Sequence, residues 1–155
     1  MVIHRSAGFS LVELTMVVAI VAIVSAIAVP RFSNATVRYQ LDAAARRLTG
    51  DIEYAQQEAI ASSSSRTLTF NFLGMSYTIT KRDSSGNASV VSVISLNDGP
   101  YRASSLTASI AGNTSTPIIF DGFGKPNGAG TIQLKLGAET RIITMDGITG
   151  RLSVR

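Results

Sequence analysis

Residues 9–30, FSLVELTMVVAIVAIVSAIAVP, are predominantly apolar and contain a single charged side chain, Glu13. The many valines and isoleucines would suit a buried strand, but strands rarely exceed about ten residues. A helix that spans a bilayer needs roughly 20 mainly apolar residues. The length of this run therefore predicts a helix, transmembrane over residues 9–30, and not a strand.

The residues before this run, MVIHRSAG, end in the small residue Gly8. An ordinary secretory signal carries its cleavage site after the apolar stretch, so that the stretch is lost on processing. Here the order is reversed, and a cut after Gly8 would remove residues 1–8 as a leader but keep the apolar helix. The mature protein is therefore predicted to be membrane-embedded or packed in a helical bundle.

Glu13 needs an explanation, because a carboxylate at mid-bilayer costs on the order of 2.5–3.5 kcal/mol. After a cut between Gly8 and Phe9, the new amine of Phe9 would lie one helical turn away, roughly 6 Å along the axis. That amine, on this chain or on a neighbour, could neutralise Glu13. Alternatively, Glu13 stands near a helix start, where the helix dipole and headgroup water favour a carboxylate. Its position alone fits both interpretations.

The helix is predicted to continue over residues 31–61 as an amphipathic segment, and the serines at 62–65 to end it. Apolar residues recur there at spacings of three and four, namely Val37, Leu41, Ala44, Leu48, Ile52, Ala55 and Ala59. Arg38, Asp42 and Arg46 follow one another at i, i+4 on another face. Such pairs stabilise a helix by a few tenths of a kcal/mol each.

After residue 65 the hydrophobic pattern changes to a period of two, which predicts a β-rich domain over residues 66–155. Eight short strands are expected, at 67–72, 76–81, 89–96, 106–110, 117–120, 131–136, 140–145 and 151–154. Turns rich in glycine, asparagine and aspartate separate them. The sequence thus predicts an α+β fold, with a long N-terminal helix packed on a C-terminal antiparallel sheet or two-sheet domain.

The amino-acid composition of the chain argues against a catalytic function. The chain of 155 residues has no cysteine, and its one histidine, His4, would leave with the leader. No metal-ligand cluster or nucleophile–base pair can be assembled, so we expect no enzyme activity, no metal and no cofactor. The glycine-rich segment 122–128 has neither the P-loop nor the dinucleotide spacing. The net charge of +4 falls to +3 without Arg5 (4 − 1 = 3), a weak basic bias typical of surface solubility.

The octapeptide GFSLVELT, residues 8–15, followed by the apolar run and Pro30, resembles the type IV prepilin cleavage and methylation motif. That pattern is Gly, Phe, Thr or Ser, Leu, an aliphatic residue and Glu, before an apolar helix with a proline near its end. The resemblance implies that a prepilin peptidase/methyltransferase cuts between Gly8 and Phe9 on the cytoplasmic side and methylates the Phe9 amine. It also implies that Glu13 pairs with the N-terminus of an adjacent subunit during filament assembly.

The C-terminal part resembles the GspH/FimT family of minor pilins and pseudopilins. The matching segments are 118–120, the glycine-rich 121–130, 131–134, 141–143 and 150–151. The resemblance implies a type IV pilin-like fold and a structural subunit of an inner-membrane-anchored filament, in type II protein secretion or type IV pilus assembly. Its partners would be other pilins or pseudopilins, through the N-terminal helix, and membrane lipid.

The two indications of membrane orientation disagree. Four arginines follow the apolar run within residues 31–47, whereas only Arg5 precedes it, and this count would place the C-terminal part in the cytoplasm. The prepilin motif instead places the leader inside and the domain in the periplasm. Because the motif specifies which end a peptidase must reach, we expect a single-pass inner-membrane protein with a periplasmic domain, assembled into a filament or pseudopilus.

DNA is an alternative partner. Some FimT-type minor pilins take up DNA through a C-terminal Gly-Arg-x-Arg motif, and residues 150–155 here are GRLSVR, so Ser153 replaces the second arginine. Arg151, Ser153 and Arg155 would share one face of a strand, and Arg155 could substitute for the missing cation. So few phosphate contacts would bind weakly and depend strongly on salt. The interpretation that these arginines protect an edge strand from aggregation is favoured.

Overall fold

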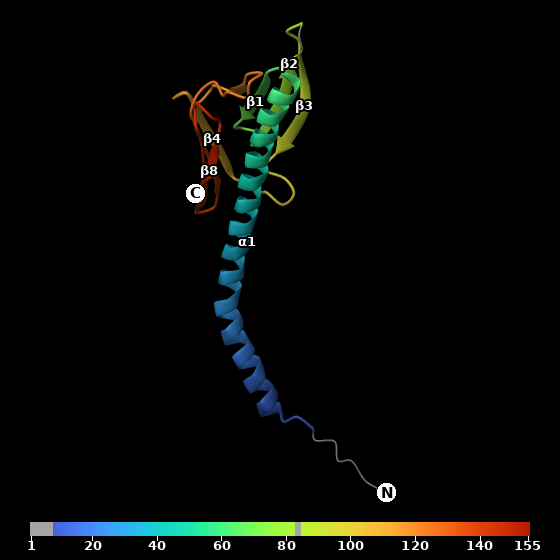
Figure 1. Ribbon diagram of the computed structural model, residues 1–155. Coiled ribbons are helices and arrows are strands. Elements are labelled where there is room, and N and C mark those ends of the chain that lie inside the picture. The colour runs from blue at the N-terminus through green and yellow to red at the C-terminus, as the bar shows by residue number, and fades with distance from the viewer. Residues whose placement is uncertain (1–7, 83–84) are drawn as a thin grey trace. The chain divides into compact units, whose positions relative to one another are not determined.

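The computed structural model describes residues 8–82 and 85–155, and the side chains of residues 27–34 lie outside this description. The described chain forms one long helix followed by strands only (Figure 1). Their bounds are α1 Leu11–Ser62, β1 Arg66–Asn71, β2 Ser76–Arg82, β3 Ala88–Ser95, β4 Ser105–Ile110, β5 Ile118–Phe120, β6 Gly130–Leu136, β7 Glu139–Met145 and β8 Leu152–Val154. The predicted α+β class is confirmed, and each predicted strand forms with ends within one or two residues.

The chain divides into two compact units, Met1–Thr36 and Val37–Arg155, called here the N-terminal and the C-terminal unit. Helix α1 contributes to both. Residues 1–7 of the predicted leader lie outside the described residues.

Helix α1 begins at Leu11, later than the Phe9 start predicted from hydrophobicity. The backbone carbonyl of Ser10 accepts a hydrogen bond from the amide of Leu14 at 3.1 Å, so Ser10 is the N-cap residue. Serine is among the preferred residues at that position, and Glu13 three residues later completes the sequence spacing of a capping box. Helix capping therefore sets the start, and Phe9 precedes it.

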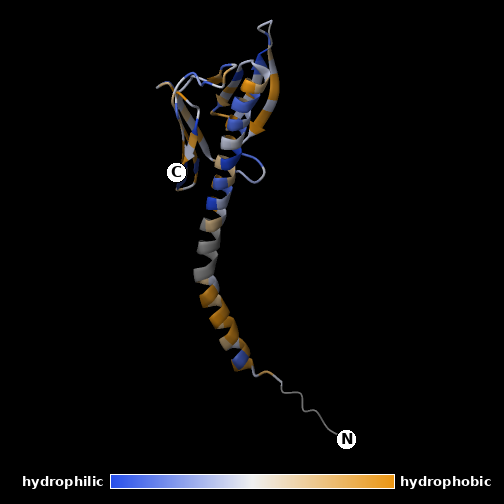
Figure 2. Ribbon diagram, viewed as in Figure 1, coloured by the Kyte–Doolittle hydropathy of each residue, from blue (hydrophilic) through white to orange (hydrophobic). Residues whose placement is uncertain are grey.

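The N-terminal part of α1 is apolar (Figure 2). Its large side chains are exposed, with 67% exposure for Met16, and Phe9 just before the helix is 80% exposed. Within the described residues, no helix combines the length and hydropathy needed to cross a membrane. The predicted segment 9–30 includes positions 27–30, whose side chains lie outside the description.

In the C-terminal unit, α1 buries the row of apolar residues at spacings of three and four that the sequence predicts, called here the apolar stripe. Of the stripe residues, those from Leu41 to Ala59 are fully buried, and Val37 at its beginning is partly exposed. These side chains join one core cluster with residues from both sheets, including Tyr77, Phe120 and Ile143. Burial of such a stripe, and not helix propensity, is what stabilises a helix in a folded domain.

The strands form two antiparallel four-stranded sheets. One has the order β3-β2-β1-β5 and the other the order β4-β6-β7-β8, called here sheet A and sheet B. Strand β3 pairs with β2 through a register shift next to Ile79 and Thr80. Strand β8 pairs only with β7, so it forms an edge of sheet B. Alternate residues of each central strand enter the core, as in Gly130–Leu136, where Ile132 and Leu134 are buried.

Two ion pairs join α1 to sheet B. Arg141 donates to Asp42 at 2.6 Å, and Arg38 donates to Glu139 at 2.9 Å. The predicted i, i+4 series of Arg38, Asp42 and Arg46 is therefore wrong for its first two members. Their charges meet partners about one hundred residues away in sequence, which helical spacing cannot indicate.

Candidate functional sites

The predicted cleavage junction lies in irregular, exposed backbone ahead of α1. Gly8 and Phe9 are both exposed, and a Cβ atom added to Gly8 would meet nothing within 4 Å. A peptide bond in such a segment can adopt the extended geometry that proteases bind without unfolding a helix. Glu13 follows within the first turn of α1 and is also exposed.

The apolar side chains around Glu13 leave it surrounded by unburied hydrophobic surface. Leu11, Val12 and Leu14 are 78%, 70% and 59% exposed. Contiguous exposed apolar patches on proteins mark surfaces that meet a membrane or another protein. Once the patch is covered, a charged carboxylate inside it is stabilised by pairing with a cation. Glu13 can therefore form an ion pair inside an apolar contact that covers this part of α1.

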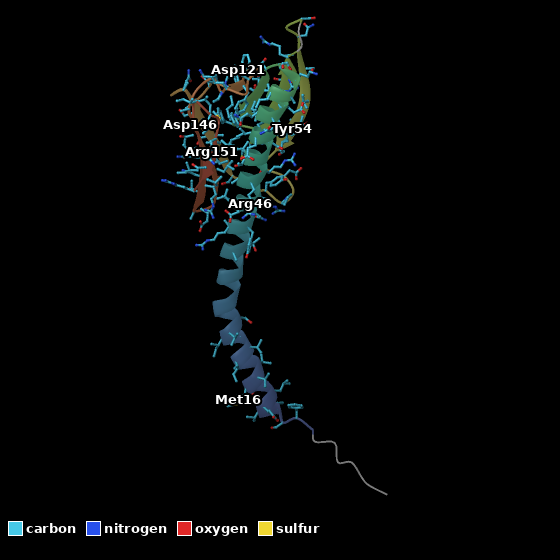
Figure 3. The ribbon with its side chains drawn as sticks, in the orientation of Figure 1. Met16, Arg46, Tyr54, Asp121, Asp146 and Arg151 are labelled. Carbon is cyan, nitrogen blue, oxygen red and sulfur yellow. The ribbon has the colours of Figure 1, made fainter. Side chains whose placement is uncertain are left out.

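The second candidate region is the turn between β7 and β8, which carries Arg151 (Figure 3). Asp146 organises this turn, because its Oδ1 accepts hydrogen bonds from the amide of Thr149 at 2.7 Å, the hydroxyl of Thr149 at 2.7 Å and the amide of Ile148 at 3.1 Å. These bonds, above all that from the Thr149 amide, lower the pKa of Asp146 below its usual value. Asp146 is therefore held as a carboxylate.

Gln56 of α1 fixes this turn against a second loop. Its Nε2 donates to the carbonyl oxygens of Gly124 and Thr149, both at 2.8 Å. Gly150 has a φ of +72°, and a Cβ atom there would lie 2.6 Å from Gln56 Nε2, so a larger residue would be strained and would displace Gln56. The prediction from sequence missed Gln56, because an amide on a helix gives no periodic signal and its two acceptors are 68 and 93 residues away.

The register of β8 places the predicted cations on one face. Thr144 faces Ser153 across the ladder, and residues 142 and 155 exchange two backbone hydrogen bonds. Since side chains alternate along a strand, Arg151, Ser153 and Arg155 share the outer face of sheet B, opposite the core. The register of β6 adds Lys135 to that face. Arg151 and Arg155 are exposed, as is Lys135.

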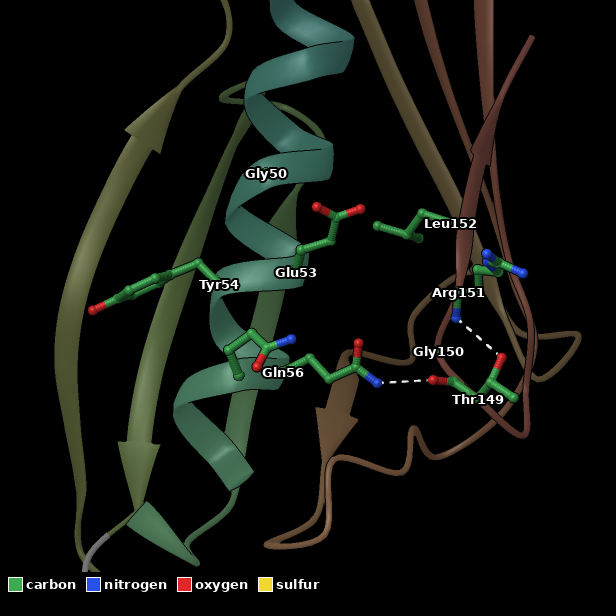
Figure 4. Close-up of a pocket in the computed structure, with 9 residues that line it drawn as sticks. Gly50, Glu53, Tyr54, Gln56, Thr149, Gly150, Arg151 and Leu152 are labelled. Atoms are coloured by element: carbon green, nitrogen blue, oxygen red, sulfur yellow. Dashed lines mark hydrogen bonds between the residues drawn. The ribbon is translucent and has the colours of Figure 1, made fainter. Parts of the chain in front are cut away.

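A groove of about 690 Å³ separates β8 from the exposed face of α1 (Figure 4). Its helical wall contains Gly50, Glu53, Tyr54, Gln56 and Gln57, and its other wall is formed by residues 149–152. Glu53 and Leu152 extend toward each other across it, whereas Arg151 lies at β8. Among the described residues, no group of three or more histidine, aspartate or glutamate side chains could hold a metal ion.

Residues 44–149 match the family described as type II transport protein GspH, and this match covers more than half of the chain. The chain belongs to the GspH family. This GspH-family chain also matches the prokaryotic N-terminal methylation motif over residues 3–29, which includes Gly8, Phe9 and Glu13. Comparison with curated proteins gives no match.

Two solved structures share the fold of this GspH-family chain, both of the type IV minor pilin FimU from Pseudomonas aeruginosa. The crystal structure in space group P21 aligns with a TM-score of 0.58 and 21% identity, over 76% of this chain and 90% of FimU. That in space group P65 gives a TM-score of 0.55 and 18% identity, over 74% and 92% of the two chains. These alignments support the predicted type IV pilin-like fold.

Proposed function

We propose that this chain is a minor pilin-like structural subunit of an inner-membrane-anchored filament, acting in type II protein secretion or type IV pilus assembly. The observation that carries the proposal is Glu13, a lone carboxylate in an exposed apolar helix that follows an open Gly8–Phe9 junction. The match to the methylation motif over residues 3–29 supports it. The role requires no catalysis by this chain, because packing of helices supplies the mechanism.

In this mechanism a prepilin peptidase cuts after Gly8, and the resulting amine of Phe9 is methylated and stays protonated. The apolar residues 9–24 then pack against lipid or against equivalent helices of other subunits, with the C-terminal unit in the periplasm. Covering this surface strips water from Glu13, which raises the cost of its charge. Pairing with the amine of a neighbouring subunit removes that cost, so correct axial placement of subunits is favoured over misaligned placement.

Replacing Glu13 tests the assembly step. We expect Glu13→Ala to reduce incorporation into filaments by at least about tenfold, since truncating one partner of a buried ion pair costs roughly 3–5 kcal/mol. Incorporation is measured as the fraction of subunit in sheared filament preparations. Thr15→Ala, a similar truncation in the same exposed part of α1, should incorporate normally. Equal incorporation of the Glu13→Ala and parent chains would exclude the pairing role.

Processing has a separate test. Intact-mass measurement of the protein isolated from its native membranes should give a chain that begins at Phe9 and carries one additional methyl group. A chain that keeps residues 1–8 would rule out cleavage at this junction. Such a chain would instead be a single-pass anchor for its β domain, with an accidental match to the cleavage motif.

A second candidate function is DNA binding by the outer face of sheet B. The observation that favours it is the shared face of Arg151, Arg155 and Lys135, which presents three exposed cations. Phosphate contacts from these cations would be independent of base sequence and would weaken as salt rises. The serine at position 153 lowers the charge of the face relative to a Gly-Arg-x-Arg motif.

A gel-shift titration of the full chain in detergent tests this second candidate. Arg151→Ala should weaken binding of a DNA duplex and reduce the slope of log affinity against log salt by about 0.9. Arg46→Ala removes an exposed arginine from α1 and serves as the control, since it leaves sheet B intact. If Arg151→Ala and Arg46→Ala bind DNA as the parent chain does, the outer face is not a DNA site.

A further inference from the structure

Strand β8 presents unpaired backbone groups along the open edge of sheet B. The amide and carbonyl of Arg155 both bond to Ile142, and the carbonyl of Arg151 accepts from the amide of Asp146. In an antiparallel ladder, residues that bond to the partner strand alternate with residues whose groups point away from it. Leu152 and Val154 therefore direct their N–H and C=O groups outward, where the described chain supplies no further strand.

The groove between β8 and α1 meets this edge at Leu152. Tyr54 and Leu152 give its walls apolar surface, and Tyr54 is 55% exposed. Gly50 in the helical wall has open space around it, since an added Cβ atom would meet nothing within 4 Å. A glycine inside a helix costs about 1 kcal/mol relative to alanine, and the packing of this chain does not require it. Close approach of another backbone would use that space.

The dimensions of the groove suit an extended peptide. From Gly50 to Gln57 the helix rises roughly 10.5 Å. That length corresponds to about three residues of a strand at roughly 3.3 Å each. Strand β8, Leu152–Val154, has the same length. Addition of a strand would satisfy the outward groups of Leu152 and Val154, which is how peptides bind to sheet edges elsewhere.

The charged side chains around the groove indicate which side chains an added strand should carry. Glu53 faces the groove from α1 and points toward Leu152, whereas the side chain of Arg151, whose backbone contributes to the groove wall, points to the outer face of sheet B. Side chains of an added strand alternate between these two sides. Basic residues would therefore face Glu53, and acidic residues would lie beside Arg151. Neither charge has an ion-pair partner among the described residues. Strand β3 of a second copy, ASVVSVIS, is uncharged and lacks this complementarity.

We propose that an extended peptide segment of a partner protein, with alternating basic and acidic side chains, adds to β8 in the groove between β8 and α1. The segment pairs with the backbone of Leu152 and Val154 and lies over Gly50. This inference is independent of leader cleavage and filament assembly, so the uncleaved chain is suitable for its test.

The test is fluorescence polarisation of the full chain in detergent with a labelled peptide of alternating lysine and glutamate. Gly50→Phe should weaken binding at least about tenfold, because the ring fills the groove. Phenylalanine is a better helix former than glycine, so the helix is retained. Gly50→Ala is the matched control and should bind with nearly unchanged affinity. Val154→Pro should also weaken binding, since it removes an outward donor that β7 does not use, and Val154→Ala is its control.

Three results in the binding assay would overturn the proposal. They are absence of binding by the parent chain, equal binding by the Gly50→Phe chain, and equal binding of a peptide whose lysines and glutamates are grouped in two blocks. The blocked peptide has the same net charge but cannot place one sign on each side of the sheet. Circular dichroism of each variant confirms that weaker binding does not arise from unfolding. Sedimentation that showed self-association through this groove would replace the partner segment with a second copy, against the proposal.

Discussion

The carboxylate of Asp146 accepts three hydrogen bonds from the turn that follows it, and the amide of Gln56 then joins that turn to the loop at Gly124. Each of these residues satisfies backbone groups that would otherwise lack partners at the end of sheet B. Their joint effect is to fix the position of Thr149 and Gly150, directly before Arg151. Polar side chains thus help to fix the backbone directly before the candidate cation, Arg151.

Asp146 gives a prediction about pH. Its pKa is lowered in the folded chain, so its charge stabilises the fold at all pH values above the ordinary value of 3.8, and this stabilisation is lost as pH falls through the folded pKa. We expect Asp146→Asn to melt at a lower temperature than the parent chain at neutral pH, with the difference shrinking well below pH 3.8. Melting is followed by circular dichroism at neutral pH and at a pH well below 3.8.

Asp98→Asn is the control for this measurement, because the Asp98 carboxylate accepts one short hydrogen bond, from the adjacent Gly99 amide. Its melting temperature should change less at neutral pH. A difference between the parent and Asp146→Asn chains that stays constant across the pH range would show that the charge of Asp146 does not contribute.

Gln56 gives a second prediction at this scale. Gln56→Ala leaves the carbonyls of Gly124 and Thr149 without their donor, and we expect a loss of about 1–3 kcal/mol in the free energy of unfolding. Urea denaturation measures it. Gln57→Ala, which removes the exposed neighbouring amide, should change the free energy by less than about 0.5 kcal/mol. Similar losses for the two variants would contradict the bridging role.

At the scale of elements, local patterns were sufficient to predict α1 and every strand from β1 to β8. Alternation with glycine- and asparagine-rich turns locates strands, and a stripe at spacings of three and four locates the buried face of a helix. The pairing order of the strands could not be predicted, because local patterns do not specify which edges meet. The start of α1 was also missed, since hydrophobicity continues through Phe9 while Ser10 caps the helix.

Local sequence patterns also could not predict the contacts that join one element to another. Tyr77 is fully buried in β2 and donates its hydroxyl proton to Asp51 of α1, which is also paired with Arg47 at 2.9 Å. Burial, and next the bond to Asp51, raise the pKa of Tyr77, so the hydroxyl stays protonated. In the sequence, Tyr77 is indistinguishable from any core aromatic residue, and Asp51 from any surface acid on a helix.

Deleting a single oxygen atom, that of the Tyr77 hydroxyl, removes this contact between α1 and sheet A. We expect Tyr77→Phe to lower the free energy of unfolding by about 1.5–3 kcal/mol, because a hydrogen bond to a charged group is lost inside the domain. The ring itself stays packed, so the loss measures the bond to Asp51. Tyr54→Phe removes the same oxygen from an exposed ring and should have an effect below about 0.5 kcal/mol. Equal stability of the Tyr77→Phe and parent chains would show that Arg47 alone satisfies Asp51.

At the scale of the whole molecule, folding and association use different parts of the chain. Every buried hydrophobic residue in the described chain lies at Leu41 or beyond. The large apolar residues between Phe9 and Val24 are at least half exposed. A core that excludes the most hydrophobic segment of a sequence indicates that this segment is kept for contacts outside the chain. Helix α1 thus serves as a core element in one unit and as an unburied apolar surface in the other.

Removing residues 1–36 separates these two roles. A chain that begins at Val37 keeps the whole C-terminal unit, including the ion pairs of Arg38 and Asp42 with sheet B. We expect its cooperative melting transition to match that of the full chain in detergent, because none of the described side chains that it loses is buried. We also expect it to sediment as a monomer without detergent, whereas the full chain should associate through its exposed apolar residues. A broad or absent transition in the shortened chain would mean that the N-terminal unit stabilises the core. Association of the shortened chain would instead assign the contact to the sheets.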